Sequence, residues 1–204
     1  MSGPIPMSQV ERYPAVVIHR ACELDPESFG DRLGACVSAS LRIILDELGL
    51  GKHASRCELG VTITNDDGIR RINREHRGID RSTDTLSFPV SDAWELVGDG
   101  DRHASLSLSP APAVGDAPPI VLGDIVMSVE TITRQADESD LGFVERFAEC
   151  LAHGILHLLG WDHENEGEKK RMEELEDRLV PKIAESLGGW GPRDFGPGGG
   201  DKRR

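Results

Sequence analysis

Three histidines within eleven residues constrain this chain more than any other feature. His153 and His157 lie four positions apart in the stretch HGILHLLGWDH, and His163 closes it. On a helix, residues four positions apart leave the same face, so these two rings can share one ion. A continuous helix would point His163 elsewhere. Gly160 removes the conflict, because a glycine after an apolar helical run is a common left-handed helix end, and a turn there returns His163 to the other two rings.

Three neutral imidazoles with no fourth protein ligand are typical of a catalytic zinc, because structural zinc sites usually fill all four positions, mostly with cysteine. We therefore predict one Zn²⁺ per chain, bound by His153, His157 and His163, with an open position for water. Cys150 lies one helical turn before His153 and is a further candidate ligand. A cysteine in such a place is more often a small buried hydrophobe, so the predicted ligand set excludes it.

The histidine spacing equals that of the metzincin peptidases, H-E-x-x-H-x-x-G-x-x-H, with one difference that bears on function. Gly154 stands where those peptidases have the glutamate that serves as general base. The pattern thus retains the metal ligands and lacks the base for peptide hydrolysis. Glu149, one turn before His153, is a candidate for taking a proton, although a glutamate in such a place more often orients a metal ligand or is simply exposed.

Length and charge restrict the class of protein. The 204 residues show no internal shift in composition, which predicts a single domain. The net charge of −13 argues against a protein that coats nucleic acid by bulk electrostatics, so any RNA contact must come from a local patch. The cysteines form no C-x-x-C pair, and we find neither a signal-peptide pattern nor an apolar stretch long enough for a bilayer. We expect a soluble, cytoplasmic protein without a membrane partner.

Hydrophobic patterns along the chain predict four strands and five helices. The β-branched, strand-like runs span residues 13–19, 57–64, 83–89 and 120–129. The helical patterns span about 26–49, 66–72, 128–139, 141–160 and 164–187. A chain that begins strand, helix, strand, helix is typical of an α/β fold. The pattern at 141–160 is apolar nearly all round, which predicts a buried, central helix that carries the metal site and ends at Gly160.

The sequence also predicts the boundaries of the domain. We expect a flexible N-terminus at 1–12, one domain at 13–187, and a surface insertion at about 91–119 that is rich in Gly, Asp, Ser, Ala and Pro. The Gly-rich tail, 188–204, is expected to be disordered, because it offers little apolar surface to offset its ordering entropy.

Five arginines in twelve residues form the only strong basic patch of the predicted domain: Arg70, Arg71, Arg74, Arg77 and Arg81. On composition alone the patch is as consistent with a solvated helix face as with a binding surface.

Three blocks of the sequence carry a family resemblance: NREHRGIDRSTDTLSFP at 73–89, LGDI at 122–125 and HGILHLLGWDH at 153–163. On these blocks the chain resembles the YbeY family, the bacterial zinc-dependent rRNA maturation factors described as endoribonucleases. The resemblance runs from about 13 to 187, and it departs at Ser82, where the family usually has proline. It implies a mixed sheet of about four strands packed with helices, zinc on the three histidines, and an activity that needs Arg77.

The resemblance also implies the function. We expect an endoribonuclease that cuts single-stranded RNA in late maturation of the small-subunit rRNA 3′ end and in ribosome quality control. Its partners would be rRNA and the ribosome or small ribosomal subunit, and no DNA is expected. Two alternatives stay open on the sequence: a zinc peptidase-like hydrolase, which Gly154 weakens, and a non-catalytic ribosome-associated factor whose zinc stabilises the fold.

Overall fold

The computed structural model describes residues 15–20, 27–90, 119–139, 141–163 and 165–195. The expected flexible N-terminus, nearly all of the expected insertion at 91–119, and the last nine residues of the expected tail lie outside these ranges. Of the helices within the described ranges, none has the length and apolarity needed to cross a bilayer.

Within the described ranges the chain forms four strands, five α-helices and two short 3₁₀ helices. They are β1 (Ala15–Arg20), α1 (Glu27–Glu47), η2 (Gly51–Arg56), β2 (Cys57–Thr64), α2 (Asp66–Arg77), β3 (Thr85–Pro89), β4 (Ile120–Ser128), α3 (Val129–Glu138), α4 (Phe143–Leu158), α5 (Glu166–Leu187) and η3 (Pro192–Phe195).

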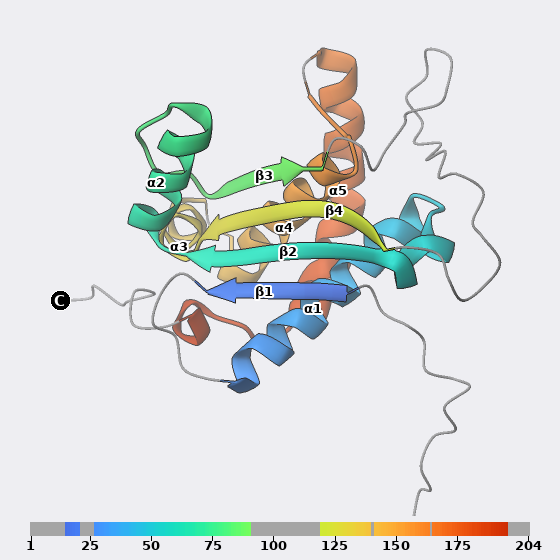
Figure 1. The fold of residues 1–204 in the computed structure, drawn as a ribbon, viewed down its shortest axis with the longest axis horizontal. Coiled ribbons are helices and arrows are strands. Elements are labelled where there is room, and N and C mark those ends of the chain that lie inside the picture. The colour runs from blue at the N-terminus through green and yellow to red at the C-terminus, as the bar shows by residue number, and fades with distance from the viewer. Residues whose placement is uncertain (1–14, 21–26, 91–118, 140, 164, 196–204) are drawn as a thin grey trace, which may run out of the picture.

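The strands form one mixed sheet in the order β1-β2-β4-β3. The pairs β1–β2 and β2–β4 are parallel, and β3 runs antiparallel to β4 at the sheet edge. In Figure 1 the sheet lies in front of α1, α4 and α5, while α2 and α3 lie at one end of it. The expectation of a single-domain α/β protein with a mixed sheet is confirmed.

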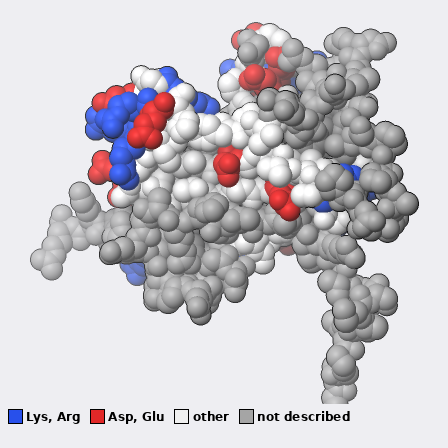
Figure 2. All heavy atoms as spheres, viewed as in Figure 1, with Lys and Arg blue, Asp and Glu red and all other residues white. Residues whose placement is uncertain are grey.

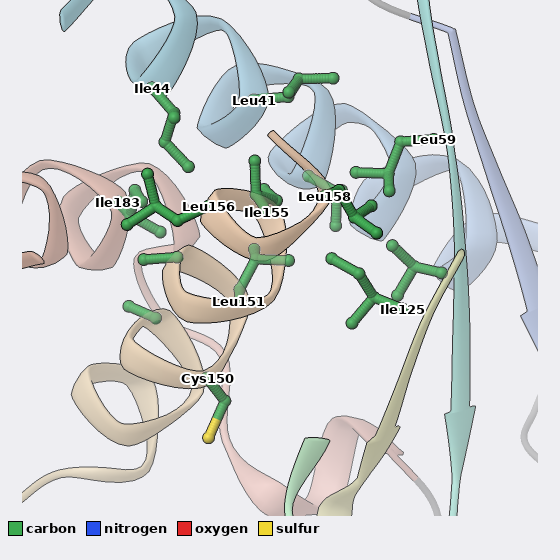
Figure 3. Packing of buried hydrophobic residues seen from close by; sticks show 14 of the residues in the cluster. Leu41, Ile44, Leu59, Ile125, Cys150, Leu151, Ile155, Leu156, Leu158 and Ile183 are labelled. Atoms are coloured by element: carbon green, nitrogen blue, oxygen red, sulfur yellow. The ribbon is translucent and has the colours of Figure 1, made fainter. Parts of the chain in front are cut away.

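Helix α4 is the centre of the main hydrophobic core, as its all-round apolar pattern predicts. Nine of its residues are buried, and they pack against α1, α5 and the sheet. Figure 3 shows this packing, with α4 contributing Leu151, Ile155, Leu156 and Leu158 and its neighbours contributing Leu41, Ile44, Leu59, Ile125 and Ile183. Burying one such side chain fully stabilises the fold by about 1.5–3 kcal/mol. Because many such side chains fix α4 in the core, the helix is a rigid support for His153 and His157.

The expected disorder of the tail is wrong for residues 188–195. Trp190 and Phe195 are buried, and the Phe195 ring lies 5.4 Å from Phe143 and 5.2 Å from Phe147, measured between ring centroids. The Arg32 guanidinium stacks on the Trp190 ring at 4.3 Å from its centroid. Two aromatic rings bury enough apolar surface to order a short Gly-rich segment, and a pattern based on periodicity does not register them.

Candidate metal centre

A glycine turn after α4 brings the third histidine of the stretch to the first two. Gly160 has a left-handed φ of 80°, which favours glycine. The Gly160 N–H donates to the His157 carbonyl at 3.0 Å, and the Trp161 N–H donates to the Leu156 carbonyl at 3.0 Å. These two bonds form a Schellman motif, which ends the helix at Leu158 and reverses the chain. The predicted turn is therefore present, with His163 directly after it.

The three imidazoles converge at this turn. One ligand nitrogen from each of His153, His157 and His163 lies within 4.8 Å of the others. The Nε2 atoms of His153 and His157 are 3.0 Å apart, and the ring centroids of the three pairs are separated by 4.4, 5.7 and 5.2 Å. In the described part of the chain, no other group of three histidine, cysteine or acidic side chains meets this condition.

The outer nitrogens of two rings are already occupied by acceptors. His153 Nδ1 lies 2.9 Å from Glu176 Oε1, and His157 Nδ1 lies 2.9 Å from the Trp161 carbonyl oxygen. Because both partners accept, each Nδ1 carries a proton, and in a neutral ring Nε2 then presents its lone pair to the centre. Burial, followed by the two neighbouring imidazoles, lowers the pKa of His157, which keeps this ring neutral.

This arrangement fits a metal ion. Two Nε2 atoms that face each other at 3.0 Å need a proton or a metal ion between them, because two lone pairs at this distance repel. Nitrogen ligands about 2.0–2.1 Å from a tetrahedral zinc are separated by roughly 3.3 Å, close to that spacing. The donor set consists of neutral imidazole nitrogens, which suit zinc and other transition metals better than magnesium or calcium.

Arg77 is connected to the histidine site through one residue of the edge strand. It ends α2, which is terminated by Gly78 in a left-handed conformation with φ 71°. Its Nη2 donates to the Ser87 carbonyl oxygen at 3.5 Å, and the Ser87 hydroxyl donates to the Gly154 carbonyl oxygen at 3.4 Å. Both bonds are long, and Arg77 is exposed. The tertiary fold thus places this arginine beside the helix segment that carries His153 and His157.

Comparison with known proteins identifies the family. Residues 25–184 match the family model described as Endoribonuclease YbeY. The chain belongs to the YbeY family. It is 40% identical over 147 residues to Endoribonuclease YbeY of Shouchella clausii, an alignment that covers 70% of this chain and 85% of that one. It is 33% identical over 181 residues to Endoribonuclease YbeY of a Bradyrhizobium species, covering 89% and 90% of the two chains.

A solved structure shows the same fold. The solution structure of TM1509 from Thermotoga maritima aligns with a TM-score of 0.52 and 23% sequence identity, over 92% of this chain and 97% of that one. The two chains therefore share one fold over most of their length.

Gly154 of this YbeY chain faces the sheet. A Cβ atom at this position would lie 3.0 Å from Ile125 Cδ1 and 3.3 Å from Ser87 Oγ. Helix α4 therefore approaches β3 and β4 too closely for a long side chain. In this chain, the position that carries the glutamate base in metzincins is a glycine packed where α4 contacts the sheet.

The structure changes the interpretation of the acidic residues around the site. Glu149 Oε2 accepts a 2.7 Å hydrogen bond from Arg146, and the carboxylate beside Nδ1 of His153 is that of Glu176 on α5. The local sequence does not single out Glu176, which is one of several acidic residues of α5 and lies beside the buried Leu175. Cys150 is buried, which raises the pKa of its thiol to about 12, and it lies outside the histidine cluster.

Proposed function

We propose that this protein is a zinc-dependent endoribonuclease that cuts single-stranded RNA, with one Zn²⁺ per chain on His153, His157 and His163. The observation that carries the proposal is the approach of the His153 and His157 Nε2 atoms to 3.0 Å, with a hydrogen-bond acceptor beside each Nδ1. Membership of a family whose characterised relatives are named endoribonucleases supports RNA as the substrate.

Each group at the site has a distinct part in the proposed reaction. When bound, zinc supplies a positive charge that acidifies water and polarises a phosphoryl oxygen. Glu176 and the Trp161 carbonyl hold the imidazole rings in one tautomer and orientation. Arg77 is the proposed catalytic residue, because a planar guanidinium can pair with two non-bridging phosphate oxygens as charge develops on them.

The arginines of α2 and the loop after it are proposed to bind the RNA backbone. Figure 2 shows Lys and Arg side chains gathered over α2, whereas the rest of the described surface in this view has few of them. Arg70 pairs with Asp80 at 2.8 Å, and Arg74 lies 3.7 Å from the same carboxylate. Within the described part of the chain, Arg71 and Arg81 have no side-chain partner, and Arg77 has only its long bond to Ser87. These three cations are therefore the most available for phosphates.

The biological setting of the proposal is late maturation of the small-subunit rRNA 3′ end and ribosome quality control in the cytoplasm, with the ribosome or its small subunit as partner. A peptidase function is disfavoured by the packing of Gly154 against Ile125. A non-catalytic factor with a fold-stabilising zinc has the same ligands, and experiment must separate it from the enzyme.

The decisive experiment compares RNA cleavage by four preparations purified in parallel: the wild-type protein with zinc, the wild-type protein after chelation, His157→Ala and His53→Ala. His53 lies in η2 and serves as a matched histidine outside the site. We expect only zinc-loaded wild type and His53→Ala to cleave a single-stranded RNA, and neither to cleave its duplex. The chelated wild type should regain this activity when zinc is added back. Equal cleavage by His157→Ala would reveal a contaminating nuclease. Zinc-dependent thermal stability without cleavage would favour the non-catalytic factor.

A further inference from the structure

A groove of about 470 Å³ adjoins the histidine site between α4, α5 and the start of β3. His153 forms part of its lining, together with Asp84, Arg146, Glu149, Asp177 and Val180. We call it the α4–α5 groove. Arg146 and Glu149 lie one to two helical turns before His153, so a ligand in the groove would adjoin a group held at the histidines.

The charges of the groove disfavour a phosphate. Among the described residues that line the groove, Arg146 is the only lysine or arginine, and four carboxylates accompany it. The Arg146 guanidinium is already committed, since it donates to Asp84 at 2.8 Å, to Glu149 at 2.7 Å and to Gln135 at 3.0 Å. An RNA phosphate in this groove would meet uncompensated negative charge.

The same charges do not form a cation site. Asp84 and Glu149 are paired with Arg146, and Glu176 is bonded to His153. Across the described ranges, the carboxylates of the groove do not converge closely enough to count as a metal-binding group.

An uncharged ring with hydrogen-bond donors suits the groove. Val180 and Pro181 form an apolar wall, and the neutral thiol of Cys150 lies in the lining. In Figure 3 the Cys150 sulfur points away from the leucines of the core. Asp177 is exposed at this groove, and within the described residues no group donates a hydrogen bond to its carboxylate. Its oxygens are free to accept from a ligand.

We infer that the α4–α5 groove binds the nucleobase next to the scissile phosphodiester and favours bases with an exocyclic amino group, with Asp177 as the acceptor. This inference rests on the proposed function. A phosphodiester held between the histidines and Arg77 places a neighbouring base beside His153, where the groove begins. Adenine, cytosine and guanine present an amino donor, whereas uracil presents a carbonyl oxygen at the equivalent edge and would be repelled by a carboxylate.

The test uses equilibrium binding of single-stranded five-residue RNAs to the zinc-loaded protein. The central residue is adenosine, cytidine, uridine or purine riboside, which is adenosine without its amino group, and the flanking residues are uridines. We expect the adenosine and cytidine oligomers to bind roughly tenfold more tightly than the other two, the discrimination that one hydrogen bond to a charged group provides. Equal binding of the adenosine and purine riboside oligomers by wild type would overturn the inference.

Two variants and one control locate the residues that discriminate between the bases. Asp177→Asn exchanges an acceptor for an amide that both accepts and donates, so it should bind all four oligomers within about twofold of one another. Glu185→Gln makes the same change at an exposed position of α5 outside the groove and should behave as wild type. Val180→Trp fills the groove and should weaken binding of the adenosine and cytidine oligomers to the level of the uridine oligomer. Undiminished discrimination in Asp177→Asn would also overturn the inference.

Cleavage of the same oligomers separates this inference from the proposed function. Base discrimination in binding without any zinc-dependent cleavage would support the groove and reject the endoribonuclease. Cleavage by wild type without discrimination between the bases would have the opposite meaning. It would support the endoribonuclease activity and reject base binding in the α4–α5 groove.

Discussion

Glu176 on α5 lies 2.9 Å from Nδ1 of His153 on α4, across the contact between two helices. This carboxylate is half-buried, and the contact fixes the tautomer of a proposed metal ligand from outside the histidine stretch. The proposed metal centre therefore depends on the packing of α5 as well as on its own turn.

Glu176→Ala should lower zinc affinity by about 10–100-fold, the usual effect of removing a carboxylate behind a histidine ligand. Glu176→Gln should fall between this variant and wild type, because the amide oxygen still accepts from Nδ1. Competition with a chromophoric chelator measures the affinity. Glu174→Gln, on the exposed side of the same helix, is the control. If Glu176→Ala bound zinc as tightly as wild type, the contact between Glu176 and His153 would not support metal binding.

Arg77→Ala should abolish RNA cleavage while zinc content and fold persist, and Arg77→Lys should restore little. If the guanidinium stabilises charge in the transition state, turnover should fall by roughly 10²-fold or more, while RNA affinity, shared with the other arginines, falls much less. Cleavage rate and affinity at two salt concentrations distinguish this role from electrostatic steering, and Arg71→Ala controls for lost charge. Near-normal turnover in Arg77→Lys would exclude the transition-state role.

Asp66, which lies where α2 contacts α3, should make the free energy of unfolding depend on pH. Burial by itself would raise the pKa of Asp66, but hydrogen bonds from Ser128 and Thr131 and the pairing with Arg134 outweigh burial and lower it. A lowered folded-state pKa means that the stabilisation is present above the unfolded pKa of about 4 and is lost as pH falls through the folded value. Asp66→Asn should therefore reduce the free energy of unfolding by about 1–3 kcal/mol at pH 7.

Urea denaturation of wild type and Asp66→Asn at pH 7 and near pH 3 tests this expectation. The difference between the two proteins should shrink at the acid end. Asp67→Asn is the control, since Asp67 is an exposed neighbour in the same helical turn. A difference that stays constant with pH would show that ionisation of Asp66 plays no part.

Phe195→Ala should destabilise the domain by about 3–5 kcal/mol, as for other buried phenylalanines. Its ring lies within 5.2–5.5 Å of those of Phe147, Phe143 and Trp190, between centroids. Phe195→Leu keeps most of the apolar volume and should cost less. Thermal or urea unfolding measures both variants. A melting temperature within a degree of wild type for Phe195→Ala would show that the segment after α5 adds nothing to the core.

Gly154→Glu should destabilise the fold without creating a peptidase. The new side chain would start 3.0 Å from Ile125 Cδ1 and force a carboxylate toward the sheet, at a cost of several kcal/mol. Unfolding experiments and casein hydrolysis with added zinc check the two parts. Zinc-dependent casein cleavage by this variant would badly weaken the assignment of the scaffold to RNA chemistry.

Features that are local in the chain could be predicted from the sequence alone. His153, His157, Gly160 and His163 lie within eleven residues, so helix geometry and one left-handed glycine suffice to bring the rings together. The all-round apolar pattern of α4 likewise predicted its burial, since a helix without a polar face has no stable place at the surface. The strand and helix positions follow from the same short-range periodicity.

Which distant residues meet at the site depends on how the helices and the sheet pack, and this could not be predicted from the sequence. Glu176 is 23 positions from His153, and Ser87, which lies between Arg77 and Gly154, is 67 positions from Gly154. Periodicity indicates which face of a helix is buried, but it does not indicate what lies opposite. The α4–α5 groove and the packing of Trp190 and Phe195 arise from how α4, α5 and the sheet pack together, and such contacts between remote segments leave no mark in the local sequence.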